Sequence, residues 1–136
     1  MKLLLIYCRR FSYDPAVKTL AEVADETEGK EFINAQVAFI QVEESDEINS
    51  HSVVEKLVKN IKWACGKNST KNVVLHSFAH LSESKAKTEV SKNIFDLAQA
   101  KLTNAGYSAQ QTPFGFFLDL HIDAPGYSLA RIFKSF

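Results

Sequence analysis

The chain has 136 residues, of which 46% are apolar and 24% charged, and sixteen acidic side chains balance sixteen basic ones. This length suits one domain with a substantial core and is too short for two, so we expect a single domain over residues 1–136. A formal net charge of zero excludes a global attraction to nucleic acid or membrane, and an anionic partner would need a local basic patch.

The first residues are hydrophobic but form a segment too short for a signal peptide or a membrane span. Residues 3–7 show no alternation of apolar and polar side chains, which predicts a strand covered on both faces. Cys8 and Cys65 stand alone without a CxxC spacing, which is typical of a reducing compartment and predicts neither a disulfide nor a zinc site. The four histidines have no metal-ligand spacing, and we expect neither a metal nor another cofactor.

The segment over residues 8–34 is ambiguous, because its apolar residues are compatible with a second strand or with a short helix. Pro15 argues against a central strand position, since proline cannot donate a ladder hydrogen bond. Residues 25–30 form a charged run that predicts a solvated loop, and residues 35–43 alternate as a strand does before an acidic turn over residues 43–47.

Two helices are predicted in the middle of the chain. Ser52 and Glu55 have the spacing of a capping box, and apolar residues then recur at helical spacing until Gly66, a natural stop. The apolar stripe of this helix consists of Val54, Leu57, Val58, Ile61 and Cys65. A second amphipathic helix is predicted over residues 88–104, with Gly106 ending it.

Residues 73–75 predict a buried strand that lies between the two helices and opens into the polar segment 76–82. In open α/β sheets ligands bind at the carboxyl ends of strands, although histidines beside a strand are more often structural than catalytic. The chain contains no Walker A, GxGxxG or GxSxG motif, so the common enzyme classes lack support from motifs.

Three further strands are predicted at the carboxyl end, over residues 107–112, 116–123 and 128–133. Pro125 and Gly126 predict a turn that returns the last strand as the antiparallel hairpin partner of the one before it. The order of elements predicts a mixed α/β sandwich and not a purely parallel doubly wound sheet.

Four blocks carry a resemblance to a known family: MKLLLI at residues 1–6, VAFIQVE at 37–43, FAHLS at 78–82 and PFGF at 113–116. In this order and at these separations they resemble the amino-terminal editing domain of archaeal-type threonyl-tRNA synthetase. The resemblance extends from about Met1 to Ile132, and the FAHLS block is the most specific part of it.

This resemblance implies the fold of D-aminoacyl-tRNA deacylases, a homodimer, and hydrolysis of serine wrongly esterified to threonine tRNA. It further implies that the 2′-hydroxyl of the tRNA and the protein backbone position the attacking water. The partners implied are the acceptor end of aminoacyl-tRNA and a threonyl-tRNA synthetase. The short hydrophobic start and the isolated cysteines predict no membrane partner and a cytoplasmic location.

By resemblance, His80 takes the position of the family's active-site histidine. The substrate-binding residues implied are those that would line the pocket or lie near the adenosine, together with those that replace family site residues. They are Ala79, Glu43, Glu44, Phe114, Gly115, Phe117, Leu118 and Arg131.

Three of these positions depart from the family pattern. Phe117 and Leu118 stand where family members carry Tyr-Lys, and Arg131 stands in place of a glutamate. Leucine can neither donate a hydrogen bond nor carry charge. The sequence therefore leaves open an active deacylase, a deacylase of changed specificity, and a non-catalytic relative kept as a tRNA-binding, protein-binding or dimerisation module.

Overall fold

The computed structural model describes all of residues 1–136 as one mixed sheet with two α-helices packed against it. Its elements follow in chain order as β1 (Lys2–Lys18), β2 (Lys30–Gln41), the 3₁₀-helix η1 (Glu44–Glu47), α1 (Ser50–Lys67), β3 (Asn72–Ser77), α2 (Thr88–Asn104), β4 (Ser108–Gln111), β5 (Phe116–Asp123), the 3₁₀-helix η2 (Ser128–Ala130) and β6 (Arg131–Ser135). The strand order is β4-β3-β2-β1-β5, and β6 also pairs with β1. Neither α-helix is long and apolar enough to span a membrane.

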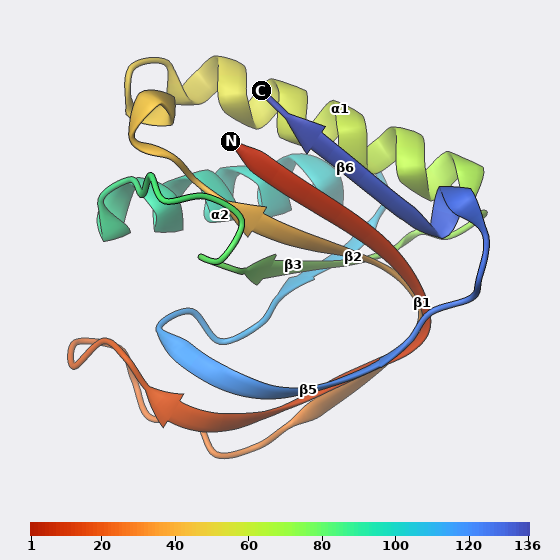
Figure 1. The fold of residues 1–136 in the computed structure, drawn as a ribbon, viewed down its shortest axis with the longest axis horizontal. Helices are drawn as coiled ribbons and strands as arrows, with labels where there is room; N and C mark the ends of the chain where they lie inside the picture. Colours follow the sequence, from red (N-terminus) through yellow and green to blue (C-terminus); the bar gives the residue numbers. More distant parts are fainter.

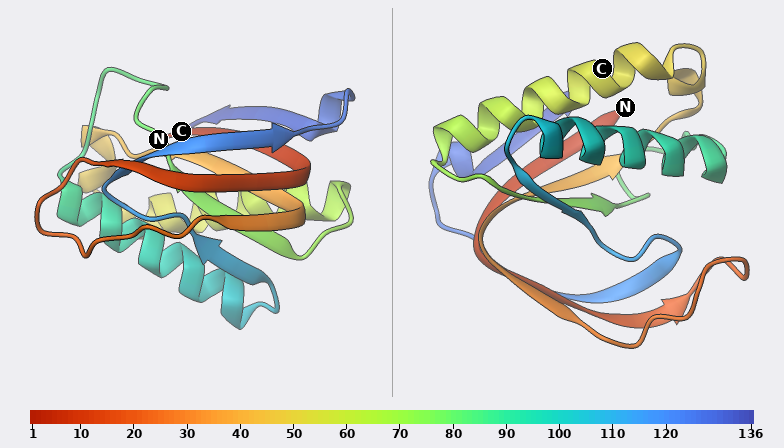
Figure 2. Two further views of the ribbon diagram at one scale, coloured as in Figure 1. Left: turned by 90° about the horizontal axis from the view of Figure 1, so that it is seen from below. Right: turned by 180° about the vertical axis from the view of Figure 1, so that it is seen from behind.

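The sheet is strongly curved, and its long strands β1 and β2 extend through two layers (Figure 1). The helices α1 and α2 cover one face of the sheet, while β5 and the distal halves of β1 and β2 curl beneath the opposite face (Figures 1 and 2). Leu3 and Leu5 belong to the core under the helices, whereas Leu4 and Ile6 pack against a second core inside the curl. The prediction that residues 3–7 are covered on both faces is therefore confirmed.

The ambiguous segment 8–34 forms the outer part of a long β1–β2 hairpin, with residues 19–29 as its loop. Pro15 lies within β1 opposite Leu118, beside a register shift between Pro15 and Val17. A bulge tolerates proline because the ladder is already interrupted there. Proline therefore marks an irregularity of the strand and not its end.

The predicted carboxyl-terminal hairpin is wrong. Both β5 and β6 pair antiparallel with β1, β5 along residues 10–18 and β6 along residues 2–6, and the two strands run in the same direction. A strand of 17 residues has room for two partners along one edge. The loop around Pro125 and Gly126 consequently carries the chain further along β1 without reversing it.

The predicted start and end of α1 also need correction. The cap is Asn49, whose side chain accepts a hydrogen bond from the Ser52 amide, and the helix continues past Gly66 to Lys67. Asparagine caps as well as serine does, so two candidate caps three residues apart compete in the sequence. By contrast Gly106, with φ at 90°, follows the end of α2 as predicted.

Candidate functional site

A cavity of about 450 Å³ lies where the loop after β3, the β4–β5 connection and β5 meet. Its volume is within the range of small-ligand sites. Six of the residues implied by the sequence line it: Ala79, His80, Phe114, Gly115, Phe117 and Leu118. Segments almost forty residues apart in the chain therefore contribute to one hollow.

His80 projects its imidazole between two phenylalanines of this cavity. The ring centroids of His80 and Phe78 are 4.9 Å apart with an edge-on geometry, and those of His80 and Phe117 are 6.5 Å apart with planes only 25° from parallel. Aromatic edges and faces fix the orientation of a neighbouring ring at these separations. The imidazole is thus held in a defined direction and remains exposed to a ligand.

The loop that carries His80 is held in place by one buried side chain, Gln41, at the end of β2. Its Oε1 accepts hydrogen bonds from the Leu81 and Ser82 amides, both at 2.7 Å. Its Nε2 donates to the Ser82 and Ser84 carbonyls at 2.7 and 2.8 Å. Gln41 satisfies its amide completely in this way and fixes the loop immediately after His80. Sequence reasoning placed Gln41 only in a strand and missed this function.

Glu43 and Glu44 lie outside the cavity lining and hold the same loop through Ser82 and Ser84. The Glu43 carboxylate accepts hydrogen bonds from the Met1 ammonium at 2.8 Å and the Ser82 hydroxyl at 2.7 Å, and Lys2 lies 3.1 Å away. Partial burial favours the protonated acid, but these three donors outweigh it and lower the pKa of Glu43 to about 2. The amide of Glu44 donates to the Ser84 hydroxyl at 3.0 Å.

His76 is a second cavity-lining histidine, but it is buried, and its Nδ1 lies 2.9 Å from the Thr112 hydroxyl. Burial, with a smaller contribution from the charge of His80, lowers the pKa of His76 to about 4. His76 is therefore neutral near pH 7 and joins the end of β3 to the β4–β5 connection.

The floor of the cavity includes a contact that only the fold reveals. Gly115 has φ at 86°, and a Cβ placed on it would lie 3.0 Å from Cδ1 of Leu20. The Thr19 amide also donates to the Gly115 carbonyl at 2.8 Å. The β1–β2 loop thus closes the site, and glycine is required where it approaches.

The positions that depart from the family pattern divide into two groups. Leu118 packs against the second core while lining the cavity, and Phe117 is 57% exposed at its edge. Arg131 is not part of the lining, because it lies on β6 and its guanidinium donates to the Pro125 carbonyl at 2.7 Å.

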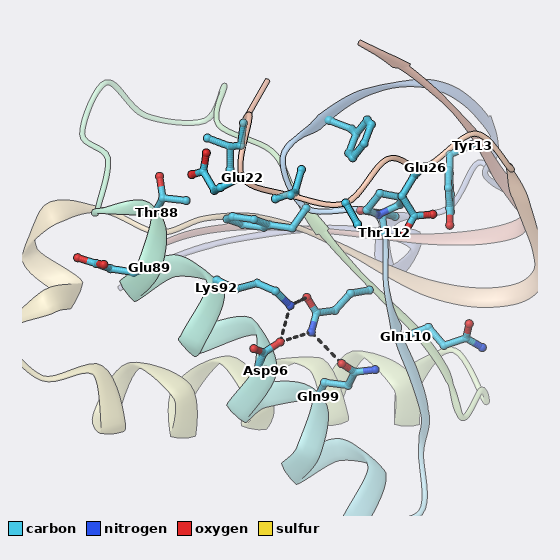
Figure 3. A pocket seen from close by; sticks show the side chains of 17 residues that line it. Tyr13, Glu22, Glu26, Thr88, Glu89, Lys92, Asp96, Gln99, Gln110 and Thr112 are labelled. Atoms are coloured by element: carbon cyan, nitrogen blue, oxygen red, sulfur yellow. Dashed lines mark hydrogen bonds and ion pairs between the residues drawn. The ribbon is translucent and has the colours of Figure 1, made fainter. Parts of the chain in front are cut away.

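A larger hollow of about 1050 Å³ adjoins the first one across Phe114 and Phe116 (Figure 3). In it Lys92, Asp96, Gln99 and Gln111 form a hydrogen-bonded network. Four carboxylates line this hollow against the single cation of Lys92: Glu22, Glu26, Glu89 and Asp96. The smaller cavity has no carboxylate in its lining, so it is the better of the two for a group attached to a polyanion.

The whole chain matches one protein family and several relatives. The family described as the archaea-specific editing domain of threonyl-tRNA synthetase matches residues 1–136. Threonine–tRNA ligases of Thermococcus kodakarensis and Pyrococcus horikoshii are 30% and 32% identical over 99% of this chain, and that of Hyperthermus butylicus is 32% identical over all of it. The chain spans only 22–23% of the length of these relatives.

Among solved structures, the c-Myc DNA Unwinding Element Binding Protein superposes with a TM-score of 0.74. The superposition covers 99% of this chain and 98% of that protein, at 13% sequence identity. At that identity the likeness concerns the fold alone. The predicted single-domain mixed α/β sandwich with two helices, of the D-aminoacyl-tRNA deacylase type, is confirmed.

Proposed function

Because this chain belongs to the archaea-specific editing-domain family of threonyl-tRNA synthetase, we propose that it hydrolyses the ester of seryl-tRNA(Thr) in the cavity beside His80. The observation that carries the proposal is the meeting of His80 with Ala79, Phe114 and Gly115 around one carboxylate-free hollow. The acceptor end of the tRNA delivers the ester, and no cofactor takes part.

The chemistry required is modest, because an aminoacyl ester is already activated. Holding the water, the ester and the terminal ribose hydroxyl in line supplies much of the barrier reduction. His80 orients the reacting groups from its fixed position between two phenylalanine rings. Its loop is in turn held by the Gln41 amide, so that the geometry is set before substrate arrives.

The harder task is to distinguish serine from threonine, which differ by one methyl group. A single apolar contact separates such a pair by only ~1–3 kcal/mol, so a second site that excludes the methyl group multiplies the selectivity. Leu20 lies close to Gly115 and forms a wall on this side of the cavity. We propose that this wall sets the size limit for the aminoacyl group.

A second function is favoured by one observation, the packing of Leu118 into the second core. Together with Leu120 and Phe116, it makes the β5 wall of the cavity apolar. In this alternative the chain binds tRNA or a protein, or dimerises, without hydrolysis. An intermediate case is a deacylase that accepts a less polar aminoacyl group.

The assembly and location follow from the same proposal. The chain acts in the cytoplasm as a homodimer, on tRNA charged by a threonyl-tRNA synthetase.

Deacylation of seryl-tRNA(Thr) by the purified chain tests the proposal. The His80→Ala variant is expected to lose at least roughly tenfold in rate, because orientation of the reacting groups is lost. The matched control is His121→Ala, since His121 is exposed on β5 and absent from the cavity lining. The parent chain and both variants should leave threonyl-tRNA(Thr) unhydrolysed. No turnover on seryl-tRNA(Thr), with tRNA binding retained, would refute the proposal. The non-catalytic alternative then requires that tRNA carrying less polar aminoacyl groups is also left intact.

A further inference from the structure

The outward face of α1 carries a row of basic side chains with a tryptophan among them. Lys56, Lys59, Trp63 and Lys67 follow one another at spacings of three, four and four residues, which places them on one side of the helix. All four are exposed. These residues, together with Lys134 of the neighbouring strand β6, are called the α1 stripe below.

Trp63 is the centre of the α1 stripe. Its indole is 45% exposed, and the ammonium groups of Lys67 and Lys134 lie 5.8 and 5.7 Å from its ring centroid. Lys134 on β6 reaches Trp63 on α1 although the two residues lie more than sixty positions apart in the chain. Trp63 is thus partly exposed, and the two ammonium groups that lie over its ring can turn outward to phosphates when a base approaches.

The charge of the α1 stripe is not neutralised within the molecule. None of its four lysines pairs with a carboxylate, and the single acidic residue of α1, Glu55, pairs with Lys101 at 2.6 Å. The chain as a whole carries no net charge. Its charges are therefore segregated, with a basic α1 face and an acidic hollow beside α2.

We propose that the α1 stripe binds single-stranded RNA, with lysine ammonium groups on the phosphates and an unstacked base on Trp63. Lys56 and Lys67 are eleven residues apart, so the stripe is ~16 Å long and covers several nucleotides. Lysine rows bind phosphate without regard to sequence, and aromatic faces add stacking energy for bases that are not paired.

The same chemistry argues against a membrane as the partner. A basic helix binds lipid by inserting an apolar face, and the apolar face of α1 is buried in the core through Val54, Leu57 and Ile61. No residue of α1 lines the cavity beside His80. The inference is therefore separate from ester hydrolysis and can be tested whether or not the chain is a deacylase.

Trp63 is the only tryptophan in the chain, so its fluorescence reports on the α1 stripe directly. The experiment titrates the whole chain with fluorescein-labelled oligouridylate and follows label anisotropy and tryptophan emission together at several salt concentrations. We expect emission to be quenched in parallel with the rise in anisotropy. The logarithm of the affinity should fall with the logarithm of salt with a slope of about −3 if four lysines contact phosphates.

Substitution of Lys67 and Lys134 together by glutamine should make that slope shallower by about 1.4, because two phosphate contacts are lost. Trp63→Ala should weaken binding by roughly tenfold or more while leaving the slope unchanged, since stacking involves no counterion release.

The matched control is the double substitution of Lys30 and Lys71 by glutamine. These lysines also lie over aromatic rings, at 5.3 Å from the Phe32 centroid and 4.2 Å from the Tyr107 centroid, and neither belongs to the α1 stripe. The control changes net charge equally and should leave affinity and slope as in the parent chain.

Three results would overturn the proposal: binding without a change in tryptophan emission, equal losses in the control and in the Lys67 and Lys134 variant, or no binding of oligouridylate at low salt. Displacement of the RNA by a lower concentration of polyglutamate would assign the α1 stripe to an acidic protein and would also refute it.

Discussion

The hydrogen bonds of Gln41 lead to a quantitative prediction about the loop that carries His80. Gln41→Leu keeps the approximate size of the side chain and removes its amide. Gln41 is only 2% exposed, and all four of its hydrogen bonds join it to the backbone of residues 81–84. The substitution therefore leaves two amides and two carbonyls without their partners.

The expected loss in the free energy of unfolding is about 2–3 kcal/mol. Each intramolecular hydrogen bond contributes about 0.5–1.5 kcal/mol, and a buried group left unpaired costs about 1–3 kcal/mol. The four contributions do not add in full, because Leu81 and Ser82 are only half-buried and water can reach part of the freed backbone. Exposure of the loop backbone should also accelerate hydrogen exchange at the Leu81 and Ser82 amides.

The control for this experiment is a second buried glutamine on the same strand. The Gln36 Oε1 accepts one hydrogen bond from Asn68, and its Nε2 has no partner. Asn68 Nδ2 also donates to the Ala64 and Leu129 carbonyls. Gln36→Leu is accordingly expected to cost about 1 kcal/mol or less. Urea unfolding and native-state hydrogen exchange measure both variants. Equal destabilisation by the two substitutions, or unchanged exchange at the loop amides, would refute the positioning role of Gln41.

Three other predictions concern the cavity. Burial lowers the pKa of His76 from 6.5 to about 4. At pH values between these two, the imidazole is protonated in the unfolded chain and neutral in the folded chain. Stability should therefore fall by about 2 kcal/mol between pH 7 and pH 5 in urea unfolding, and His76→Gln should remove most of this dependence. Gly115→Ala should destabilise by about 1–2 kcal/mol, because φ is 86° and Leu20 lies against the new Cβ, whereas Gly126→Ala, with open space around its Cβ, should be nearly neutral. Leu118→Lys should raise seryl-tRNA deacylation by roughly tenfold if the acceptor end enters the cavity, and an unchanged rate in the folded variant would mean that it does not.

Local patterns in the sequence correctly predicted those helices and strands whose apolar spacing and end residues lie within or next to the element. The strand at residues 116–123 has the bounds expected, and its alternation places Leu118 inward and Asp119 outward. The apolar face of α1 packs on the core as its helical spacing requires, and Gly106 follows the end of α2. These patterns predict structure reliably because they depend only on the geometry of a few adjacent residues.

The errors concern pairings between distant segments. A turn signal at Pro125 and Gly126 shows where the chain bends but not which strand edge is free to receive the next strand. That edge belongs to β1, which pairs with β5 along residues 10–18 and leaves residues 2–6 of the same edge free for β6. Within the ambiguous segment 8–34, the β1 residues pair with β2 on one side and with β5 on the other, so their strand conformation depends on partners that a local pattern does not contain.

The sequence by itself indicated the family, and it named five of the residues that line the cavity together with His80: Ala79, Phe114, Gly115, Phe117 and Leu118. Only the tertiary structure decided that Gln41 supports the His80 loop, that Leu20 closes the cavity floor, and that Arg131 lies outside it. The physical reason is that the chemistry of a side chain follows from its residue type, which the sequence states. The partners of that side chain depend on which groups the folded chain brings near it, such as backbone groups that the curved sheet leaves unpaired.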